Sequence, residues 1–237
     1  MSDKAFPDYR LFGRRQDRPL KLRQQQLMET LLPRVAVTEA IIEDAAAVSR
    51  PVWLEIGFGG GEHLAWHAAR NPDVLMIGAE PFINGVAKLL TQIDEQGLQN
   101  VRILHGDARD LLQKLPTGLL SRLFILHPDP WPKKKHYKRR IVSPLVLAEA
   151  ARLLRPGSEM RIASDIPDYI RWSLMQVQAH NRKSQDFLWT ALKKEDWTHP
   201  PSDWPQTRYE AKAIREGRLP TYLSFCRMPC SERQENS

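Results

Sequence analysis

Five short apolar runs, separated by helix-like segments, constrain the fold of this chain more than any other feature. The runs read "VWLEI", "VLMIGAE", "VRILHGD", "LFILHPD" and "EMRIASD", and they cover residues 52–56, 74–80, 101–107, 123–129 and 159–165. Helical patterns lie between them, at residues 62–70, 83–96, 110–115 and 143–154. Because parallel strands need such crossovers, this alternation predicts an α/β fold with a doubly wound, mostly parallel sheet.

The rest of the chain extends this core without a second repeat of the pattern. A helix is predicted near residues 167–181 and strands near 187–191 and 222–226, and a proline-rich loop precedes "TRYEAKAIREGRLP". A chain of 237 residues suits one core. We therefore expect a basic N-terminal extension over residues 1–36 and one domain over residues 37–237.

The net charge of +7 is concentrated in two segments. Residues 1–36 carry eight Lys/Arg against four Asp/Glu, and residues 127–140 carry six against one. The remainder is nearly neutral. Two basic segments on a neutral body indicate a polyanionic partner, because neutralised phosphates release counterions. A charge run that is merely solvated is the alternative interpretation.

Membrane and metal-binding classes find no support in the sequence. No apolar run reaches the roughly 18 residues of a membrane helix, and the first residues lack a secretory signal, so we expect a cytoplasmic protein. Cys226 and Cys230 lack a second pair, and His63 and His67 lack the intervening glutamate of a zinc protease. We expect structural roles for both pairs and no metal. No spacing indicates an oligomeric state.

Carboxylates follow most of the predicted strands. Four of the five runs end in Glu80, Asp107, Asp129 or Asp165, and Glu55 lies within the first. A single acid at such a place is usually a helix cap or a turn residue. Four at equivalent places are harder to explain in that way. Because ligands of open α/β sheets bind beyond the carboxyl ends of the strands, the pattern predicts a ligand site there.

The glycine turn "EIGFGGGEHL" indicates which ligand to expect. Its glycines let the backbone approach a ligand closely, but Glu62 stands where a dinucleotide fingerprint needs glycine, and no P-loop ending is present. Glu55 and Glu62 would repel a pyrophosphate, which disfavours a nicotinamide-dependent dehydrogenase. They suit S-adenosylmethionine, with its ammonium and sulfonium charges. Glu80 lies near the offset at which an acid meets ribose hydroxyls, which places Asp107 near the adenine.

The segment "HPDPWPKKKHYKRR" holds an acid in a constrained setting. Pro128 and Pro130 fix the backbone around Asp129, and Trp131 offers a stacking surface for a base. A rigid surface turn would also explain this spacing. The six Lys/Arg that follow favour a nucleic acid substrate.

These motifs resemble those of the bacterial tRNA (guanine-N7)-methyltransferases over nearly the whole chain. The matching segments are, in order, "LEIGFGGGEHL", "GAEP", "HGDA", "HPDPWPKKKHYKRR", "IASD" and "TRYE". Two departures are His127, where many members have phenylalanine, and Tyr137, which interrupts the basic run. They affect details of pocket shape and leave the acidic set intact.

The resemblance implies a class I S-adenosylmethionine-dependent methyltransferase of Rossmann-like fold that modifies tRNA, at a guanine of the variable loop. Asp129 is its expected catalytic residue. Cofactor contacts are expected from Glu55, Gly57, Glu80, Asp107 and Asp129. Substrate contacts are expected from Lys133, Asp165, Thr207, Arg208, Tyr209 and Glu210. Contacts to tRNA are expected from Lys135, His136, Tyr137, Lys138, Arg139 and Arg140.

The predicted chemistry needs acids and no metal. Guanine N7 has an available lone pair, so it attacks a sulfonium methyl without first losing a proton, and positioning does most of the work. We expect Asp129 and Glu210 to accept hydrogen bonds from the guanine N1 and N2 donors. Two alternatives remain at this point: a methyltransferase for another RNA base or a protein, and a non-catalytic RNA-binding module.

Overall fold

The computed structural model describes residue 13 and residues 15–229. Its strands are β1 (Val52–Ile56), β2 (Leu75–Ala79), β3 (Val101–Leu104), β4 (Leu120–Leu126), β5 (Leu154–Ser164), β6 (Phe187–Trp189) and β7 (Thr221–Arg227). Its α-helices are α1 (Leu22–Thr30), α2 (Leu32–Val35), α3 (Glu39–Ala47), α4 (Glu62–Arg70), α5 (Ile83–Gln96), α6 (Ala108–Lys114), α7 (Pro144–Leu153), α8 (Pro167–Ser184), α9 (Glu195–Thr198) and α10 (Arg208–Arg215). A 3₁₀ helix, η1, spans Lys134–Arg139.

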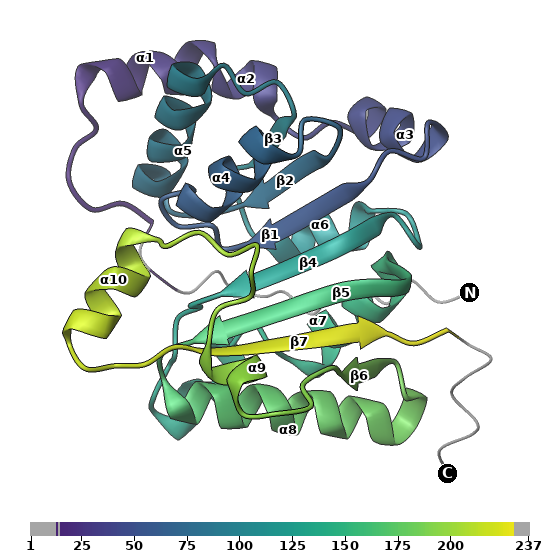
Figure 1. The fold of residues 1–237 in the computed structure, drawn as a ribbon. Coiled ribbons are helices and arrows are strands. Elements are labelled where there is room, and N and C mark those ends of the chain that lie inside the picture. Colours follow the sequence, from purple (N-terminus) through teal and green to yellow (C-terminus); the bar gives the residue numbers. More distant parts are fainter. Residues whose placement is uncertain (1–12, 14, 230–237) are drawn as a thin grey trace.

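The strands form one seven-stranded sheet in the order β3-β2-β1-β4-β5-β7-β6. The first five strands are parallel, whereas β7 runs antiparallel to both β5 and β6 (Figure 1). The strand order reverses direction at β1, where the neighbours are β2 and β4. The predicted doubly wound, mostly parallel sheet is therefore confirmed, and its switch point lies between β1 and β4, where ligands of such sheets bind.

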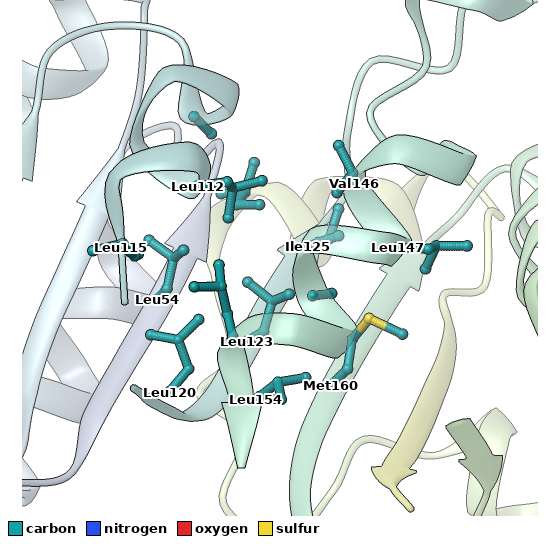
Figure 2. Packing of buried hydrophobic residues seen from close by; sticks show 14 of the residues in the cluster. Leu54, Leu112, Leu115, Leu120, Leu123, Ile125, Val146, Leu147, Leu154 and Met160 are labelled. Atoms are coloured by element: carbon teal, nitrogen blue, oxygen red, sulfur yellow. The ribbon is translucent and has the colours of Figure 1, made fainter. Parts of the chain in front are cut away.

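Helices cover both faces of the sheet and bury two apolar clusters. On one face, leucines of β1 and β4 meet side chains of α6 and α7, including Leu112 and Val146 (Figure 2). On the other face, α1, α4 and α5 pack against β2 and β3. The buried side of α5 repeats at Val86, Leu89, Leu90 and Ile93, which is the spacing of one helical face.

The bounds of β4 and β5 differ from the predicted ones for local reasons. β4 ends at Leu126 and not at Asp129, because His127 takes a left-handed φ of 46°. β5 begins at Leu154, directly after α7, and so includes the "RPG" segment that precedes the predicted start at residue 159. Gly157 takes φ 79° within it, and the β4–β5 register shifts there, between Leu120 and Arg122.

The described part of the N-terminal extension packs on the domain. α1 lies along α5 (Figure 1), and the Arg23 guanidinium donates to Asp94 of α5 at 2.8 Å. Before α1, the backbone N–H of Ile83 donates to the Arg15 carbonyl at 3.0 Å. The extension as a unit separate from residues 37–237 stays a prediction, and residues 1–12 and 14 lie outside the described part.

The helices give no sign of a membrane span. Within the described ranges, none combines the length and the apolar character that crossing a bilayer requires.

Candidate active site

The glycine turn after β1 adopts a backbone that only glycine takes readily. Gly57, Gly59 and Gly61 have φ of 72°, 55° and 75°, and Gly61 precedes the first residue of α4. The Gly59 N–H donates to Glu80 Oε2 at 2.7 Å, and the Phe82 N–H donates to Glu80 Oε1 at 2.9 Å. Glu80 therefore ties the turn after β1 to the end of β2.

Two of the predicted acids act electrostatically on a third, Glu80. Burial raises the pKa of Glu80 most, and the charges of Asp129 and Glu55 raise it further, despite the two backbone hydrogen bonds. Asp129 is exposed, yet the atoms packed around its carboxyl group desolvate it enough to raise its pKa as well. Uncompensated negative charge of this kind favours a cationic ligand.

A cavity of about 450 Å³ lies between the glycine turn and the first turn of α10. Of the predicted site residues, five line it: Glu55, Gly57, Thr207, Arg208 and Tyr209. Its wall also contains residues that the sequence analysis did not assign to the site: Phe58, Gly59, Gly60, Glu62, His63, Lys88, Leu126, His127, Trp204 and Lys212. Glu62 pairs with the Arg208 guanidinium and also accepts the backbone N–H of Arg208 at 2.7 Å, so α4 and α10 are joined across the cavity.

The segment that carries Asp129 is held in an unusual backbone conformation. His127 and Trp131 have φ of 46° and 41°, so two left-handed residues bracket Asp129. Non-glycine residues in this region are uncommon and cluster at functional sites. Trp131 also stacks with the Arg139 guanidinium, 4.9 Å from the ring centre. This backbone conformation fixes Asp129 three residues after the end of β4.

Asp165 lies at the centre of a polar group next to this turn. It is buried, and it accepts hydrogen bonds from His127 Nδ1 and the Tyr209 hydroxyl, both at 3.4 Å, and from Arg218. Burial lowers the pKa of His127, which keeps the imidazole neutral. Asp165 therefore links β5, the Asp129 segment and α10.

Glu210 is less accessible than its place in "TRYE" suggested. Its side chain is buried, and its carboxylate accepts from Trp204 Nε1 at 3.1 Å and from the Tyr222 hydroxyl. The Thr207 hydroxyl in turn accepts from the Glu210 N–H at 3.2 Å and caps α10. These contacts orient α10 against β7.

The basic run divides into exposed and buried members. Lys133, Lys135 and Lys138 are exposed, and His136, Tyr137 and Arg139 are partly exposed. Arg140 is only 3% exposed. Its guanidinium donates to the Pro130 carbonyl at 2.8 Å and to Asp168 at 2.5 Å, and it lies 3.8 Å from the centre of the Tyr137 ring. Arg140 is thus positioned to hold the run in place, and its predicted contact with RNA stays a prediction.

Two further predicted residues lie at the same edge of the sheet but outside the cavity wall. Asp107 caps α6, accepting from the Arg109 N–H at 2.9 Å, and its carboxylate also binds the Arg109 side chain. The neighbouring Gly106 N–H donates to the Glu80 carbonyl at 3.2 Å, so Asp107 lies beside Glu80. Lys133 directly precedes η1 on the surface. No trio of His, Cys, Asp and Glu in the described ranges could hold a metal ion, and Cys230 lies outside them.

The loop before α10 is anchored by a carboxylate between two arginines. Asp203 accepts from Arg122 at 2.6 Å and from Arg161 at 2.7 Å. Burial alone would raise the pKa of Asp203, but the hydrogen bonds from Arg161 and Arg122 outweigh it and lower the pKa to about 2. This anchor places Trp204 at the cavity wall.

We expect the ionised Asp203 carboxylate to stabilise the fold near neutral pH and to lose this contribution in acid. Its folded-state pKa of about 2 lies below its ordinary value, so the contribution is complete above about pH 4 and is lost as the pH falls toward 2. Urea unfolding at several pH values should show the free energy of unfolding of Asp203→Asn falling less steeply across this interval than that of the wild type. Asp73→Asn, at an exposed turn, should follow the wild type. Equal slopes for Asp203→Asn and wild type would refute the assignment.

Comparison with known proteins identifies relatives of this chain. The profile of a family described as "Putative methyltransferase" matches residues 49–222. A tRNA (guanine-N(7)-)-methyltransferase of Rhodospirillum rubrum is 48% identical, covering 97% of this chain and 92% of that protein. The enzyme of the same name from Roseobacter denitrificans is 44% identical, covering 96% of this chain and all of that protein.

Solved structures support the fold independently. The 16S rRNA methyltransferase KamB superposes with a TM-score of 0.56 at 20% identity, covering 81% of this chain and 94% of that chain. The aminoglycoside resistance methyltransferase NpmB1 gives a TM-score of 0.55 at 18% identity over the same shares. At these identities the likeness concerns the fold, which is that of class I methyltransferases. The two bacterial enzymes match this chain over nearly its full length, at 48% and 44% identity, which confirms the family that the motifs predicted. The chain belongs to the tRNA (guanine-N7)-methyltransferases.

Proposed function

We propose that this protein transfers the methyl group of S-adenosylmethionine to N7 of a guanine in tRNA, within the variable loop. The observation that carries the proposal is the gathering of Glu55, Glu80 and Asp129 around the glycine turn, in a chain that belongs to this enzyme family. A 16S rRNA (adenine(1408)-N(1))-methyltransferase that shares the fold was solved with SAM as cosubstrate.

The donor site follows from the acids and the turn. Glu55 lines the cavity and suits the ammonium group of the donor, while Gly57 allows close backbone approach. Glu80 keeps lone pairs beyond those used by Gly59 and Phe82, and these suit ribose hydroxyls. Asp107, beside Glu80, is assigned to the adenine. This set fits a cationic, phosphate-free nucleoside.

The transfer is a single displacement at carbon. The lone pair of guanine N7 forms the new N–C bond while the S–C bond breaks, and its electron pair stays on sulfur to give S-adenosylhomocysteine. Positive charge thereby moves from sulfur to the purine. A carboxylate at Asp129 stabilises this developing charge more than the neutral ground state, which lowers the barrier.

Recognition of the base is assigned to the group around Asp129 and Asp165. Asp129 accepts from the N1 and N2 donors of guanine, which adenine lacks in that arrangement. Tyr209, half exposed and in contact with His127, forms the side of this site toward α10. Because the Glu210 carboxylate is buried and already accepts from two donors, we now assign it to holding α10 and not to the base.

The exposed lysines of η1 are assigned to phosphate contacts. Replacing Lys134, Lys135 and Lys138 by alanine should weaken binding to all tRNAs and reduce the salt slope of log affinity by about 0.7 to 0.9 per lost contact. Filter binding across a salt series measures both. Replacing exposed Lys114 and Lys183, outside both basic segments, is the control and should leave the slope unchanged. An unaltered slope in the triple variant would argue against this surface.

Nucleoside mass analysis tests the proposed function directly. Unmodified tRNA incubated with the protein and S-adenosylmethionine should yield N7-methylguanosine in the variable loop. Methyl groups on adenine N6, or on protein, would favour another acceptor. Binding of tRNA without any affinity for S-adenosylmethionine would favour a non-catalytic RNA-binding module.

A further inference from the structure

Glu55 is held by a buried histidine. Its Oε2 lies 2.8 Å from Nδ1 of His63, which is in the first turn of α4, two residues after Gly61. Both side chains are only 3% exposed, and both residues line the 450 Å³ cavity. Because a carboxylate only accepts, Nδ1 of His63 carries the proton of this hydrogen bond.

A second buried histidine fixes the far side of His63. Nε2 of His67 lies 3.1 Å from Nε2 of His63. Burial, followed by the effect of His63, lowers the pKa of His67 to about 3, so His67 is neutral at physiological pH. The two histidines were expected to have a structural role only. They instead form a hydrogen-bonded chain that runs inward from the cavity wall, from Glu55 to His63 to His67.

Aromatic rings leave the His63 imidazole little freedom. Its ring centre lies 4.9 Å from that of Phe124 on β4 and 5.1 Å from that of Trp204 on the loop before α10. Phe124 also stacks on His67 at 5.5 Å. A histidine packed in this way presents Nδ1 to Glu55 in one orientation, so the rotamer of Glu55 is fixed before any ligand enters.

The two oxygens of the Glu55 carboxylate therefore differ in their hydrogen bonding. Oε2 is engaged by His63, and in the part of the chain that the structure describes, Oε1 makes no hydrogen bond. Glu55 borders the cavity, so its free oxygen is the one available to a donor from a ligand. A preset acceptor binds a cation without the entropic cost of ordering a flexible side chain.

We propose that His63 is a positioning residue for the methyl donor, holding Glu55 so that Oε1 accepts from the α-ammonium group of that donor. The inference rests on the proposed function, because it assigns the cavity beside Glu55 to the amino-acid end of S-adenosylmethionine. It goes further in naming an intervening histidine and the single ligand group that depends on it. A merely structural histidine would affect all ligands of the cavity alike.

Calorimetry with two ligands separates these roles. One is S-adenosylhomocysteine, and the other is its analogue with hydrogen in place of the α-ammonium group. His63→Leu removes the donor to Glu55 at similar volume, and it should weaken S-adenosylhomocysteine binding about tenfold while leaving the analogue unaffected. His63→Asn, which keeps an N–H donor, should restore most of the loss.

His180→Leu is the matched control. His180 on α8 forms another imidazole–carboxylate pair that is partly buried, with Asp186 at 2.7 Å, and lies outside the cavity wall. Its loss should leave the binding of both ligands unchanged. Thermal unfolding of each variant verifies that it is folded. If His63→Leu fails to fold, His63→Met, which also lacks a hydrogen-bond donor, takes its place with the same two ligands.

The possible outcomes separate the inference from the proposed function. Equal losses for the two ligands, or no loss for either, would overturn the positioning role of His63 and leave the proposed function standing. Failure of the wild-type protein to bind S-adenosylhomocysteine would overturn the proposed function itself. A loss confined to the ligand that carries the ammonium group would support the inference.

Discussion

Asp129→Asn should lower the rate of methyl transfer by about 100- to 1,000-fold while the protein stays folded. The substitution keeps the size of the side chain and removes the negative charge that, in the proposed mechanism, faces the purine as it becomes cationic. The segment itself should persist, because Arg140 holds it through the Pro130 carbonyl and the prolines fix its backbone. Single-turnover measurements with saturating tRNA and S-adenosylmethionine report the chemical step.

Two comparisons decide whether Asp129 acts on the transition state. Asp73→Asn, at an exposed turn before β2, removes the same charge elsewhere and should turn over normally. S-adenosylhomocysteine carries no sulfonium charge, so its affinity for Asp129→Asn should change far less than the rate. Near-normal turnover by Asp129→Asn would remove Asp129 from the mechanism.

Gly85→Ala should cost about a hundredfold in affinity for the methyl donor, together with roughly 1–3 kcal/mol of stability. Gly85 is in the first turn of α5, and a methyl group there would overlap the backbone carbonyl oxygen of Gly59. The glycine turn cannot yield easily, because the Gly59 N–H is held by Glu80. Either the turn or α5 must therefore move. Titration calorimetry and urea unfolding measure the two effects.

A glycine at the other end of the same helix provides the control. Gly97 follows α5 at φ 64°, and a Cβ atom there would meet nothing within 4 Å. Gly97→Asn should be tolerated, because asparagine enters the left-handed region more readily than most residues. If Gly85→Ala bound the donor as tightly as Gly97→Asn does, the close approach of α5 to the glycine turn would not be needed for donor binding.

The parallel core was predictable because its signals are local. Each buried strand is a short apolar run, and the amphipathic face of α5 is visible in its spacing. The helices α1 and α10 were not predicted, because their sequences are polar and their stability comes from packing. α10 depends on Thr207 as its cap and on the buried Glu210, whose partners Trp204 and Tyr222 are distributed along the chain.

The site was predictable as a set of acids but not as a set of contacts. Strand ends must converge in a parallel sheet, so Glu80 and Asp129 could be grouped from spacing alone. The burial of Arg140 could not be predicted, because nothing in a run of six cations distinguishes the one whose side chain packs against Tyr137. The Glu55–His63 pair also depends on how α4 leaves the glycine turn, which only three-dimensional packing determines.

The antiparallel strand β7 has a consequence for biosynthesis. One wall of the cavity comes from residues near the first strand, and the opposite wall comes from residues 204–212, which β7 secures from the far end of the polypeptide. During synthesis, a nascent chain that lacks β7 therefore holds only one wall of this cavity. We expect it to acquire affinity for the proposed methyl donor only after β7 has folded against β5.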